Sequence, residues 1–363
     1  MHVSHCVPLA PLTTLRLGGP AAALIELSNL ADFPDIVEWA GRHGSTTPVC
    51  LGHGSNVLVS DSGCTRPVLR VTTRGIKLLG PADNGRVLVE VQAGQPLRDL
   101  VDTCLAEGLS GLEMLAGVPG TAGATPVQNV GAYGQEIGDI LVRVVAWDWK
   151  LGRRVTLDAA DCQLGHRTSM FKGSSRWTLL VLVLALHRSD LSAPITYRSV
   201  ADVLDVPLGS RVPLKEVAEA VLTIRRSKGM VLEDSGVDRR TVGSVFLSPE
   251  VPTGQLAALR RLGAPVSTFP DRSTRVSASW TIRAAGFTLR APVARGVRIS
   301  SQHYTLVADS GASAASFAKA IGIVSRTVME RTGIALTSEI DGIGDVRWSP
   351  AAHGRVPALG RYQ

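Results

Sequence analysis

The segment AGVPGTAGATPVQNVGAYGQEIGD, residues 116–139, points to how this chain folds and what it holds. Half of its 24 residues are glycine, alanine or proline, and its only charged side chains are Glu136 and Asp139. Glycine lets another group come close to the main chain, whereas proline fixes the path without donating a hydrogen bond. A disordered linker would carry more charge. We therefore expect residues 116–139 to form a shaped wall for a flat ligand, and we call them the glycine-rich wall.

The composition of the whole chain indicates a globular protein of several domains. It has 363 residues, of which 45% are hydrophobic and 19% are charged, which suits two or three packed cores. No apolar run reaches the length of a transmembrane helix. The start, MHVSHCVPLAPLTTLRLGG, lacks the basic and then apolar regions of a secretory leader. A cytoplasmic protein is expected.

The distribution of charge and the spacing of the cysteines indicate which ligands this protein is expected to bind. The net charge is +7, but the basic residues are dispersed, so no nucleic-acid face is expected. A positive field instead suits phosphorylated small molecules. The cysteines show no CxxC spacing, which indicates free, mostly buried thiols and neither a disulfide frame nor a metal site. These cysteines are Cys6, Cys50, Cys64, Cys104 and Cys162.

Periodicity and turn residues predict a mixed, α+β chain. Apolar spacing and terminal Pro or Gly predict helices at 31–44, 96–109, 213–228, 252–262, 276–286 and 313–333. Alternating or β-branched runs predict strands within 47–63 and at 86–94, 139–149, 177–187 and 334–344. The residues after 345, rich in Pro, Gly and Arg, are expected to form a loose tail.

Two loops carry groups suited to anions. GHGSN, 52–56, lies between predicted strands and is either an ordinary turn or a nest of backbone N–H groups for a phosphate. GHRTSMFK, 165–172, contains Arg167, which either grips a carboxylate in a forked geometry or makes a surface ion pair. Tyr197, in PITYRSV, either presents its phenol to a phosphate or merely packs.

Two later residues are candidates for proton chemistry. Ser244 follows Gly243 in VGSVFLSP, and it is either a turn serine or a proton donor in a preorganised site. No GxSxG elbow is present, so acyl-transfer hydrolysis is not expected. Glu339, within the predicted strand at 334–344, is either a solvated outward group or a buried functional acid.

Taken in chain order, these stretches resemble the family of UDP-N-acetylenolpyruvoylglucosamine reductases. The glycine-rich wall is the most specific match, and TYRSV indicates the form of the family that carries an extra tyrosine loop. The resemblance covers residues 11–344. Its other segments are PLTTLRLGG, LGHGSNVLVSDSG, HRTSMFK, TYRSV, IRRSKGMVL, VGSVF, ISSQH and LTSEIDGIG.

The resemblance implies an α+β fold with a two-lobed FAD-binding region of the vanillyl-alcohol-oxidase type and a smaller α+β substrate-binding domain. It implies lobes at 1–72 and 73–222, a substrate domain at 223–345 and a tail at 346–363. FAD would be held non-covalently, with its pyrophosphate on Gly52, Gly54, Ser55 and Asn56. The wall residues implied in FAD binding are Val118, Pro119, Gly120, Thr121, Gly123, Ala124, Gln128, Asn129 and Gly131.

The resemblance also implies a chemistry with NADPH as the electron donor. Arg167 and Glu339 would polarise the carboxylate of the enolpyruvyl ether of UDP-N-acetylglucosamine, and Ser244 would protonate the neighbouring carbon. Glu339 must then be protonated or hydrogen-bonded, so its pKa is expected to be raised. Tyr197 and Lys228 would bind the nucleotide-phosphate part and the nicotinamide cofactor. The family suggests a monomer acting on a small nucleotide sugar, away from membranes.

Departures lie mostly in the substrate half. Ser248 stands where the family usually has an asparagine that grips the substrate, His166 replaces a usual tyrosine, and Asp309 replaces a usual asparagine. An alternative is therefore a related enzyme that reduces another enolpyruvyl nucleoside or nucleotide in specialised metabolism. Another is a flavin-binding protein without turnover, against which the joint presence of Arg167, Ser244 and Glu339 speaks.

Overall fold

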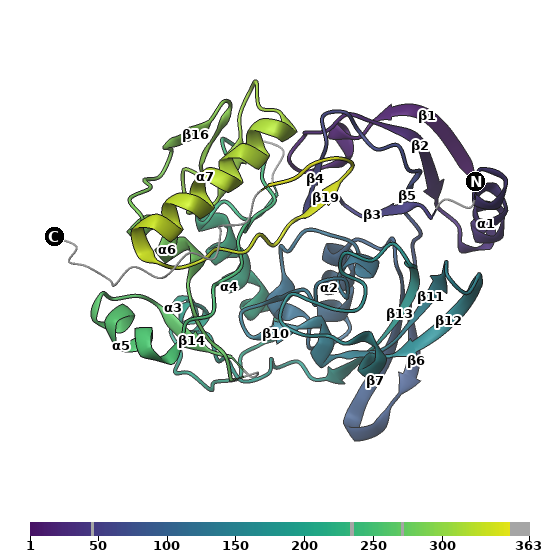
Figure 1. Ribbon diagram of the computed structural model, residues 1–363. Helices are drawn as coiled ribbons and strands as arrows, with labels where there is room; N and C mark the ends of the chain where they lie inside the picture. The colour runs from purple at the N-terminus through teal and green to yellow at the C-terminus, as the bar shows by residue number, and fades with distance from the viewer. Residues whose placement is uncertain (45–46, 233–235, 270–271, 349–363) are drawn as a thin grey trace. The chain divides into compact units, whose positions relative to one another are not determined.

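The computed structural model (Figure 1) describes residues 1–44, 47–232, 236–269 and 272–348. The chain divides into two units, and neither is continuous in sequence. Unit 1 contains Met1–Val7, Ala21–Gly54 and Thr65–Leu232, and unit 2 contains Pro8–Pro20, Ser55–Cys64 and the described residues from 236 to 348. Both combine helices and strands, so the predicted α+β class is confirmed. The finer division expected at residues 72 and 222 stays a prediction.

The larger sheet of unit 1 is antiparallel and has the order β12-β11-β13-β7-β6, with β8 also paired to β13. Its strands are β6 (Ile76–Pro81), β7 (Arg86–Gln92), β8 (Leu109–Ser110), β11 (Leu141–Asp148), β12 (Arg153–Asp158) and β13 (Trp177–Arg188). The strands predicted at 86–94, 139–149 and 177–187 are thus confirmed.

Strand β13 is buried at ten consecutive positions, from Trp177 to Leu186. A strand covered on both faces reads as a continuous apolar run, as this one does. Leu182 and Leu184 pack into the core with α2 and α4, whereas Leu180 and Val181 pack into a second core with Phe33. The central strand therefore joins both cores of unit 1.

The smaller sheet of unit 1 has the order β1-β2-β5-β3. It consists of β1 (His2–Pro8), β2 (Pro20–Leu27), β3 (Val49–Leu51) and β5 (Val68–Val71), with α1 (Phe33–Arg42) between β2 and β3. Both strands predicted within 47–63 exist, as β3 and β4 (Val57–Val59). They do not pair with each other, because β3 pairs with β5 and β4 pairs with β19 of unit 2.

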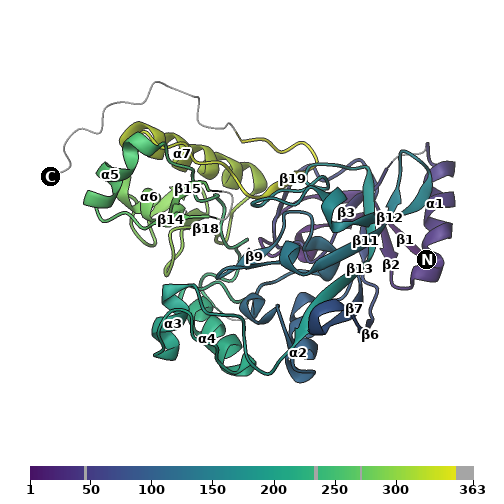
Figure 2. The ribbon, with the colours of Figure 1, turned by 90° about the horizontal axis from the view of Figure 1, so that it is seen from below.

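Three further helices belong to unit 1. They are α2 (Leu97–Ala106), α3 (Arg198–Leu204) and α4 (Leu214–Ser227). Proline precedes α2 and α4, as the sequence predicts, because a proline at a helix start loses no helical hydrogen bond. Helices α3 and α4 lie side by side (Figure 2). Short strands β9 (Gly131–Ala132) and β10 (Gln135–Glu136) form a hairpin within the glycine-rich wall.

Unit 2 is organised around helix α7 (Ala314–Thr332), which packs on the three-stranded sheet β16-β17-β18. The Ser313 side chain caps the start of α7, and Gly333 ends it with φ +69°, so this predicted helix is confirmed at both ends. The other elements are α5 (Thr253–Arg261), β14 (Val266–Thr268), β15 (Thr274–Val276), α6 (Ala278–Ala284), β16 (Pro292–Ala294), β17 (Val297–Ile299) and β18 (Leu306–Ala308).

A short parallel pair completes unit 2. Strand β4 pairs with β19 (Asp341–Ile343) in the register Val57 to Asp341. The core of unit 2 also includes Leu15, Leu17 and Leu58 from the N-terminal part of the chain. The strand predicted over 334–344 is therefore much shorter than expected, and placing Glu339 within it was wrong. Only the last residues of this segment meet β4, so Glu339 precedes the paired region.

All five cysteines are free, as predicted, but Cys6 and Cys50 are exposed, so they are not buried hydrophobic residues. No helix in the described part of the chain is long and apolar enough to cross a membrane. Most of the predicted tail, residues 349–363, lies outside the described residues.

Candidate active site

The first half of the glycine-rich wall lies along the segment that joins β7 to α2. Gly123 N donates to Ala93 O at 2.8 Å, and Ala122 N donates to Gln95 O at 2.7 Å. Leu97 N donates to Gly120 O at 3.0 Å. These three backbone bonds extend the wall alongside residues 93–97 and give partners to polar groups that are not part of a long helix or strand.

The space around Gly120 and Gly123 of the wall, and around Gly52 next to it, shows why small residues are needed here. A Cβ on Gly123 would stand 2.5 Å from the Cβ of Ala93, and one on Gly52 would stand 2.8 Å from Thr121 Oγ1. Gly52, from the predicted phosphate loop, therefore lies directly against the wall. At Gly120, φ is +145°, and apart from its two chain neighbours no described residue lies within 4 Å of the Cβ position. The wall is thus tightly packed behind Gly123 and open at Gly120.

The second half of the wall is held by Asn129, which is buried and has φ +46°. Its amide nitrogen donates to Glu136 Oε2 at 2.8 Å and to Gly165 O at 3.1 Å, and its Oδ1 accepts from Gly138 N at 2.9 Å. Asparagine tolerates this left-handed conformation better than most residues. Asn129 therefore links the wall to the segment that carries Arg167.

Arg167 binds the wall itself. Its guanidinium donates to the carbonyl oxygens of Asn129, at 3.1 Å, and Gly131. It also lies 3.7 Å from Glu136 Oε1. Ser169 Oγ donates to Val127 O at 2.7 Å nearby. The Arg167 side chain is 20% exposed, and it combines this ion pair with the two bonds to the wall, so its binding of a substrate carboxylate stays a prediction. The contacts fix the guanidinium at the wall.

A cationic and phenolic cluster lies next to the wall in unit 1. Tyr133 meets Tyr197 edge to face at 5.6 Å between ring centroids. The charge of Arg225 acts on both Tyr133 and Lys228, so Arg225 lies near both side chains. Burial and the Arg225 charge lower the pKa of Lys228. The structure thus gathers the predicted Tyr197 and Lys228 with two residues that sequence reasoning missed.

Those two residues gave only weak signals in the sequence. Tyr133 belongs to the wall segment, and Arg225 stands in IRRSK beside Lys228. Arg225 is 7% exposed, and its Nε has no hydrogen-bond partner among the described residues. Arg225 is a charged residue at a position of α4 where the helical spacing predicts an apolar side chain. This break in the apolar spacing is the sequence signal that could have identified Arg225.

In unit 2 the structure brings Ser244 and Glu339 into neighbouring strips of chain. Phe246 and Ser338 form an antiparallel bridge. Glu339 N donates to Val245 O at 2.8 Å, next to Ser244. Asn56 joins them, because its amide donates to Glu339 O at 3.2 Å. Ser244, Glu339 and Asn56 are all partly exposed, as groups that meet a ligand must be.

The catalytic and substrate-binding residues predicted from the sequence belong to two different units. Arg167, Tyr197 and Lys228 belong to unit 1, whereas Ser244, Ser248 and Glu339 belong to unit 2. The phosphate loop spans the division, with Gly52 and Gly54 in unit 1 and Ser55 and Asn56 in unit 2. Gly54 has φ +67°, as a tight loop requires. Ser248 is partly exposed and follows the bridged segment.

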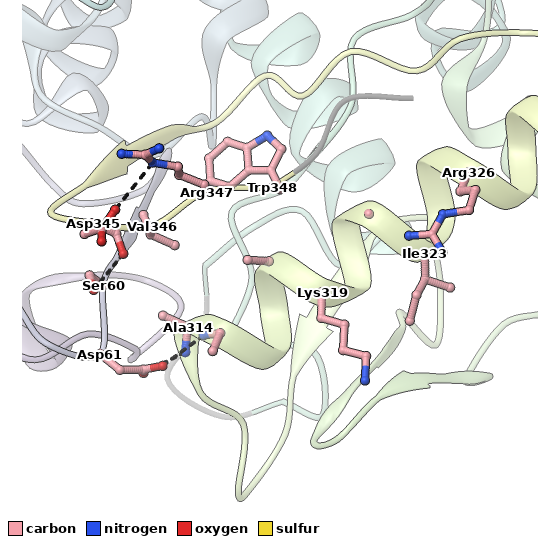
Figure 3. Close-up of a pocket in the computed structure, with 13 residues that line it drawn as sticks. Ser60, Asp61, Ala314, Lys319, Ile323, Arg326, Asp345, Val346, Arg347 and Trp348 are labelled. Carbon is pink, nitrogen blue, oxygen red and sulfur yellow. Dashed lines mark hydrogen bonds and ion pairs between the residues drawn. The ribbon is translucent and has the colours of Figure 1, made fainter. Parts of the chain in front are cut away.

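A groove of about 590 Å³ in unit 2 is separate from these residues (Figure 3). Its walls include Ser60, Lys319, Arg326 and Trp348. None of the residues predicted from the sequence lines it. Because β4 and β19 are parallel, the groove lies beyond their C-terminal ends, whereas Asn56 and Glu339 precede their N-terminal ends. The groove therefore does not belong to the candidate site.

Comparisons with known proteins fit this geometry. A family model described as an FAD-binding domain matches residues 21–158. A model for the C-terminal domain of UDP-N-acetylenolpyruvoylglucosamine reductase matches residues 235–343. The structure of UDP-N-acetylenolpyruvylglucosamine reductase from Thermus caldophilus superposes with a TM-score of 0.63 at 22% identity, over 94% of this chain and 99% of that one. The expected fold, an FAD-binding region followed by a second α+β domain, is confirmed.

Two curated relatives carry the comparison further. The UDP-N-acetylenolpyruvoylglucosamine reductase of Salinispora arenicola is 38% identical over 91% of this chain and 93% of its own length. The enzyme of the same name from Thermobifida fusca is 39% identical over 93% of this chain and 97% of its own length. With this identity sustained over nearly both full lengths, the chain belongs to the UDP-N-acetylenolpyruvoylglucosamine reductase family.

Proposed function

We propose that this protein is an FAD-dependent oxidoreductase that uses NADPH to reduce the enolpyruvyl ether of UDP-N-acetylglucosamine to UDP-N-acetylmuramate, in the synthesis of peptidoglycan precursors. The observation that carries the proposal is the pairing of the Ser244 segment with Glu339, which are far apart in sequence. Its relatives' shared name supports the substrate.

The residues present fit FAD. The wall is uncharged from 116 to 135, Gly120 leaves its outer side open, and Gly52 lies against Thr121. Such a surface can accept a flat ring while main-chain groups bind it. Bound FAD supplies hydride transfer. We assign it the wall residues from Val118 to Gly131 named above and, for its pyrophosphate, Gly52, Gly54, Ser55 and Asn56.

Two residues of the proposed mechanism act on the substrate's carboxylate. An electron-rich enol ether resists hydride attack unless its carboxylate takes up the developing charge. The Arg167 guanidinium, which donates to the carbonyls of Asn129 and Gly131, is a planar fork of N–H donors whose geometry matches a carboxylate. Glu339 assists as a neutral or hydrogen-bonded acid, because a bare carboxylate would oppose the same charge.

Ser244 donates the proton to the carbon next to the one that receives hydride. Gly243 has φ +73° and precedes Ser244, so the chain turns sharply there. A serine is a weak acid, and it works only where its position is fixed beforehand. The bonded strips around Val245 and Glu339 supply that rigidity.

The cationic and phenolic cluster suits phosphates. Arg225 and Lys228 are two cations in one partly buried setting, and Tyr133 and Tyr197 supply phenol groups. We assign this cluster to the diphosphate of the nucleotide sugar and to the phosphates of NADPH. Cations bind phosphates most strongly where water is partly excluded.

A second candidate substrate follows from Ser248. Its side chain is shorter than the asparagine usual in the family, so a different enolpyruvyl nucleoside would be the natural acceptor if this contact decides specificity. A flavin-binding protein without turnover would have no need for Arg167, Ser244 and Glu339 together. The cytoplasmic location and the monomeric state are part of the same proposal.

The test follows the flavin through both half-reactions. We expect NADPH to bleach the visible absorbance of the flavin without oxygen, and UDP-N-acetylglucosamine enolpyruvate to restore it rapidly. Restoration by another enolpyruvyl nucleoside alone would favour the second substrate. A flavin that NADPH cannot reduce would contradict an oxidoreductase that uses this donor.

Replacing Ser248 with asparagine tests the same question. If the shorter side chain weakens substrate binding, Ser248→Asn should lower the KM for UDP-N-acetylglucosamine enolpyruvate about tenfold, because one hydrogen bond to a charged group contributes about 1.5 kcal/mol. Steady-state kinetics with NADPH measure this. An unchanged KM would mean that Ser248 does not determine specificity.

Replacing Gly123 with alanine tests the wall. The added Cβ would stand 2.5 Å from the Ala93 Cβ, and the Ala93 backbone cannot yield easily. We expect a loss of about 1–3 kcal/mol in stability and a lower flavin content per protein, measured by thermal unfolding and absorbance. Gly322→Ala is the control, because its Cβ would meet no described atom and alanine favours the helix. Equal behaviour of the two variants would contradict the packing argument.

A further inference from the structure

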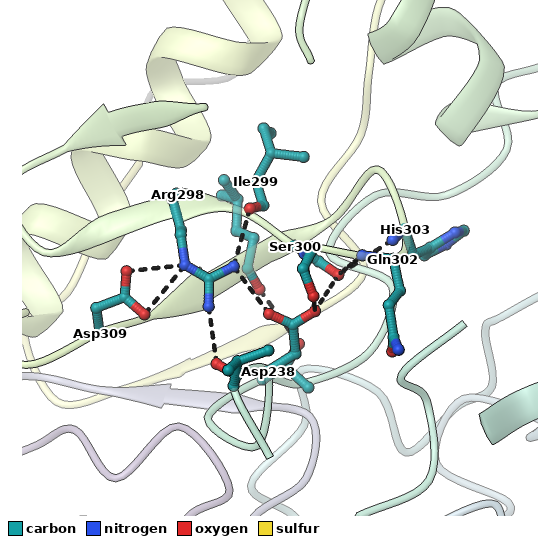
Figure 4. Close-up of polar contacts among 11 residues, drawn as sticks. Asp238, Arg298, Ile299, Ser300, Gln302, His303 and Asp309 are labelled. Atoms are coloured by element: carbon teal, nitrogen blue, oxygen red, sulfur yellow. Dashed lines mark hydrogen bonds and ion pairs between the residues drawn. The ribbon is translucent and has the colours of Figure 1, made fainter. Parts of the chain in front are cut away.

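Asp238 is a buried acid that the mechanism above does not use (Figure 4). Its Oδ1 accepts from Arg298 Nη1 at 2.8 Å. Its Oδ2 accepts from Ser300 Oγ at 2.7 Å and from both the backbone N and the Oγ of Ser301, at 2.8 and 2.7 Å. One carboxylate thus joins strand β17 to the turn that follows it, with four hydrogen bonds.

Those bonds require the ionised carboxylate, since a protonated or amide group could not accept all of them. Burial raises the pKa of Asp238, but the hydrogen bonds from Ser300, Ser301 and Arg298 outweigh it and hold the pKa below its usual value. Ser300 Oγ in turn accepts from the backbone N of Gln302 and of His303, both at 3.1 Å. Asp238 therefore organises the whole 300–303 turn.

The segment from Asp238 to Gly243, which we call the strap, lies along the next strand, β18. Ala308 N donates to Arg240 O at 2.9 Å. Thr241 Oγ1 donates to Leu306 O at 3.2 Å. Thr305 Oγ1 donates to Gly243 O. The strap is thus tied at both ends and in its middle, and the residue after it is Ser244.

We propose that Asp238 is a positioning residue for Ser244: it anchors the start of the strap to the 300–303 turn and so sets where the serine hydroxyl points. This inference rests on the proposed role of Ser244 as proton donor. Asp238 itself touches no reacting group. The 300–303 turn is bonded to Thr305, because Thr305 N donates to His303 O at 2.9 Å, and the Thr305 hydroxyl donates to Gly243 O. Without the Asp238 bonds the turn could shift and move Thr305, Gly243 and Ser244 with it, and a shift of about 1 Å can cost about 100-fold in rate.

Asp309 provides the matched control, because it binds the same residue as Asp238, Arg298. The Nε of Arg298 donates to Asp309 Oδ2 at 2.9 Å, so the guanidinium stands between two acids. The Asp309 side chain is 42% exposed, whereas that of Asp238 is 6% exposed. Asp309→Asn removes the same charge next to the same arginine and keeps the bond from the Arg240 side chain to the backbone oxygen of residue 309, at 2.8 Å. It should therefore leave the rate within about threefold, as exposed pairs contribute little.

The experiment uses the flavin-loaded protein and compares Asp238→Asn, Asp309→Asn and the wild type. We expect Asp238→Asn to slow flavin reoxidation by UDP-N-acetylglucosamine enolpyruvate about 100-fold, while NADPH reduces the flavin at the wild-type rate. Substrate affinity, measured by calorimetry, should change less than about threefold. A general loss of structure would instead affect both half-reactions and the affinity together.

A double variant separates positioning from other effects. If Asp238 acts through Ser244, then Asp238→Asn should add less than about a twofold loss in a Ser244→Ala background, because coupled residues are not additive. Additive losses would overturn the proposal. Should Asp238→Asn not fold, Ser301→Ala removes a single donor to Oδ2, and the same lack of additivity is expected.

A crystal structure of Asp238→Asn gives a readout independent of turnover. We expect Gly243 and Ser244 to be displaced relative to β18, and unchanged positions would overturn the inference. If the wild-type flavin is reduced but not reoxidised by the nucleotide sugar, the proposed function fails, and the displacement in the crystal still decides whether Asp238 positions Ser244.

Discussion

Ser244→Ala is expected to slow flavin reoxidation by UDP-N-acetylglucosamine enolpyruvate about 1,000-fold, while flavin content and reduction by NADPH stay at wild-type levels. A positioned general acid contributes about 10²–10⁴-fold, and alanine leaves no proton at this place. The backbone bond between Glu339 N and Val245 O does not involve the serine side chain, so the local structure should persist. Anaerobic stopped-flow absorbance separates the two half-reactions.

Ser338→Ala is the matched control for that experiment. Ser338 lies on the strip bridged to Phe246, and its buried Oγ has no hydrogen-bond partner among the described residues. Removing this hydroxyl should change neither half-reaction by more than about twofold, since no hydrogen bond is lost. Normal reoxidation in Ser244→Ala would mean that another group donates the proton.

Glu339→Ala is expected to reduce the same step about 1,000-fold, whereas Glu339→Gln should reduce it only about tenfold. An amide can still donate a hydrogen bond to a substrate carboxylate, as a protonated glutamic acid does, but a methyl group cannot. Both variants keep the backbone bonds that Glu339 makes to Val245 and Asn56. Single-turnover rates of the two variants measure the difference.

The pH dependence of the reoxidation rate shows whether Glu339 acts as the protonated acid or as the carboxylate. If the protonated form acts, the wild-type rate falls as the pH rises and the acid loses its proton, whereas the Gln variant lacks this fall. Equal losses in both variants, or a wild-type rate that rises with pH, would show that Glu339 works as a carboxylate.

Local patterns predicted most of the elements, because each depends on neighbours in sequence. The buried run from Trp177 to Leu186 identified β13, and Ser313 and Gly333 marked the ends of α7. The glycine-rich wall was recognised because close packing such as that of Gly123 on Ala93 leaves a trace in residue size. The resemblance then named the ligand that such a wall holds.

Contacts between residues that are distant in the sequence could not be predicted from local patterns. The periodicity around Glu339 suits a strand, but only Asp341–Ile343 have a partner in β4, so register decided the outcome. The contact of Asn56 with Glu339, and that of Arg225 with Tyr133, join residues from distant segments. A sequence contains those side chains without stating which of them meet.

Unit 2 is built from segments that lie far apart in the sequence, and this affects how the chain folds while it is being synthesised. Leu15, Leu17 and Leu58 are buried in a core whose other members begin at Val242. Strand β4 can pair only after β19, near the end of the described chain, has been synthesised. At about 5–20 residues per second on the ribosome, these apolar side chains stay uncovered for about 15–60 s after they are made. A fragment that begins near residue 233 would lack Leu15, Leu17 and Leu58, and with them part of its own core. Truncated versions for structural work should therefore keep the first 64 residues.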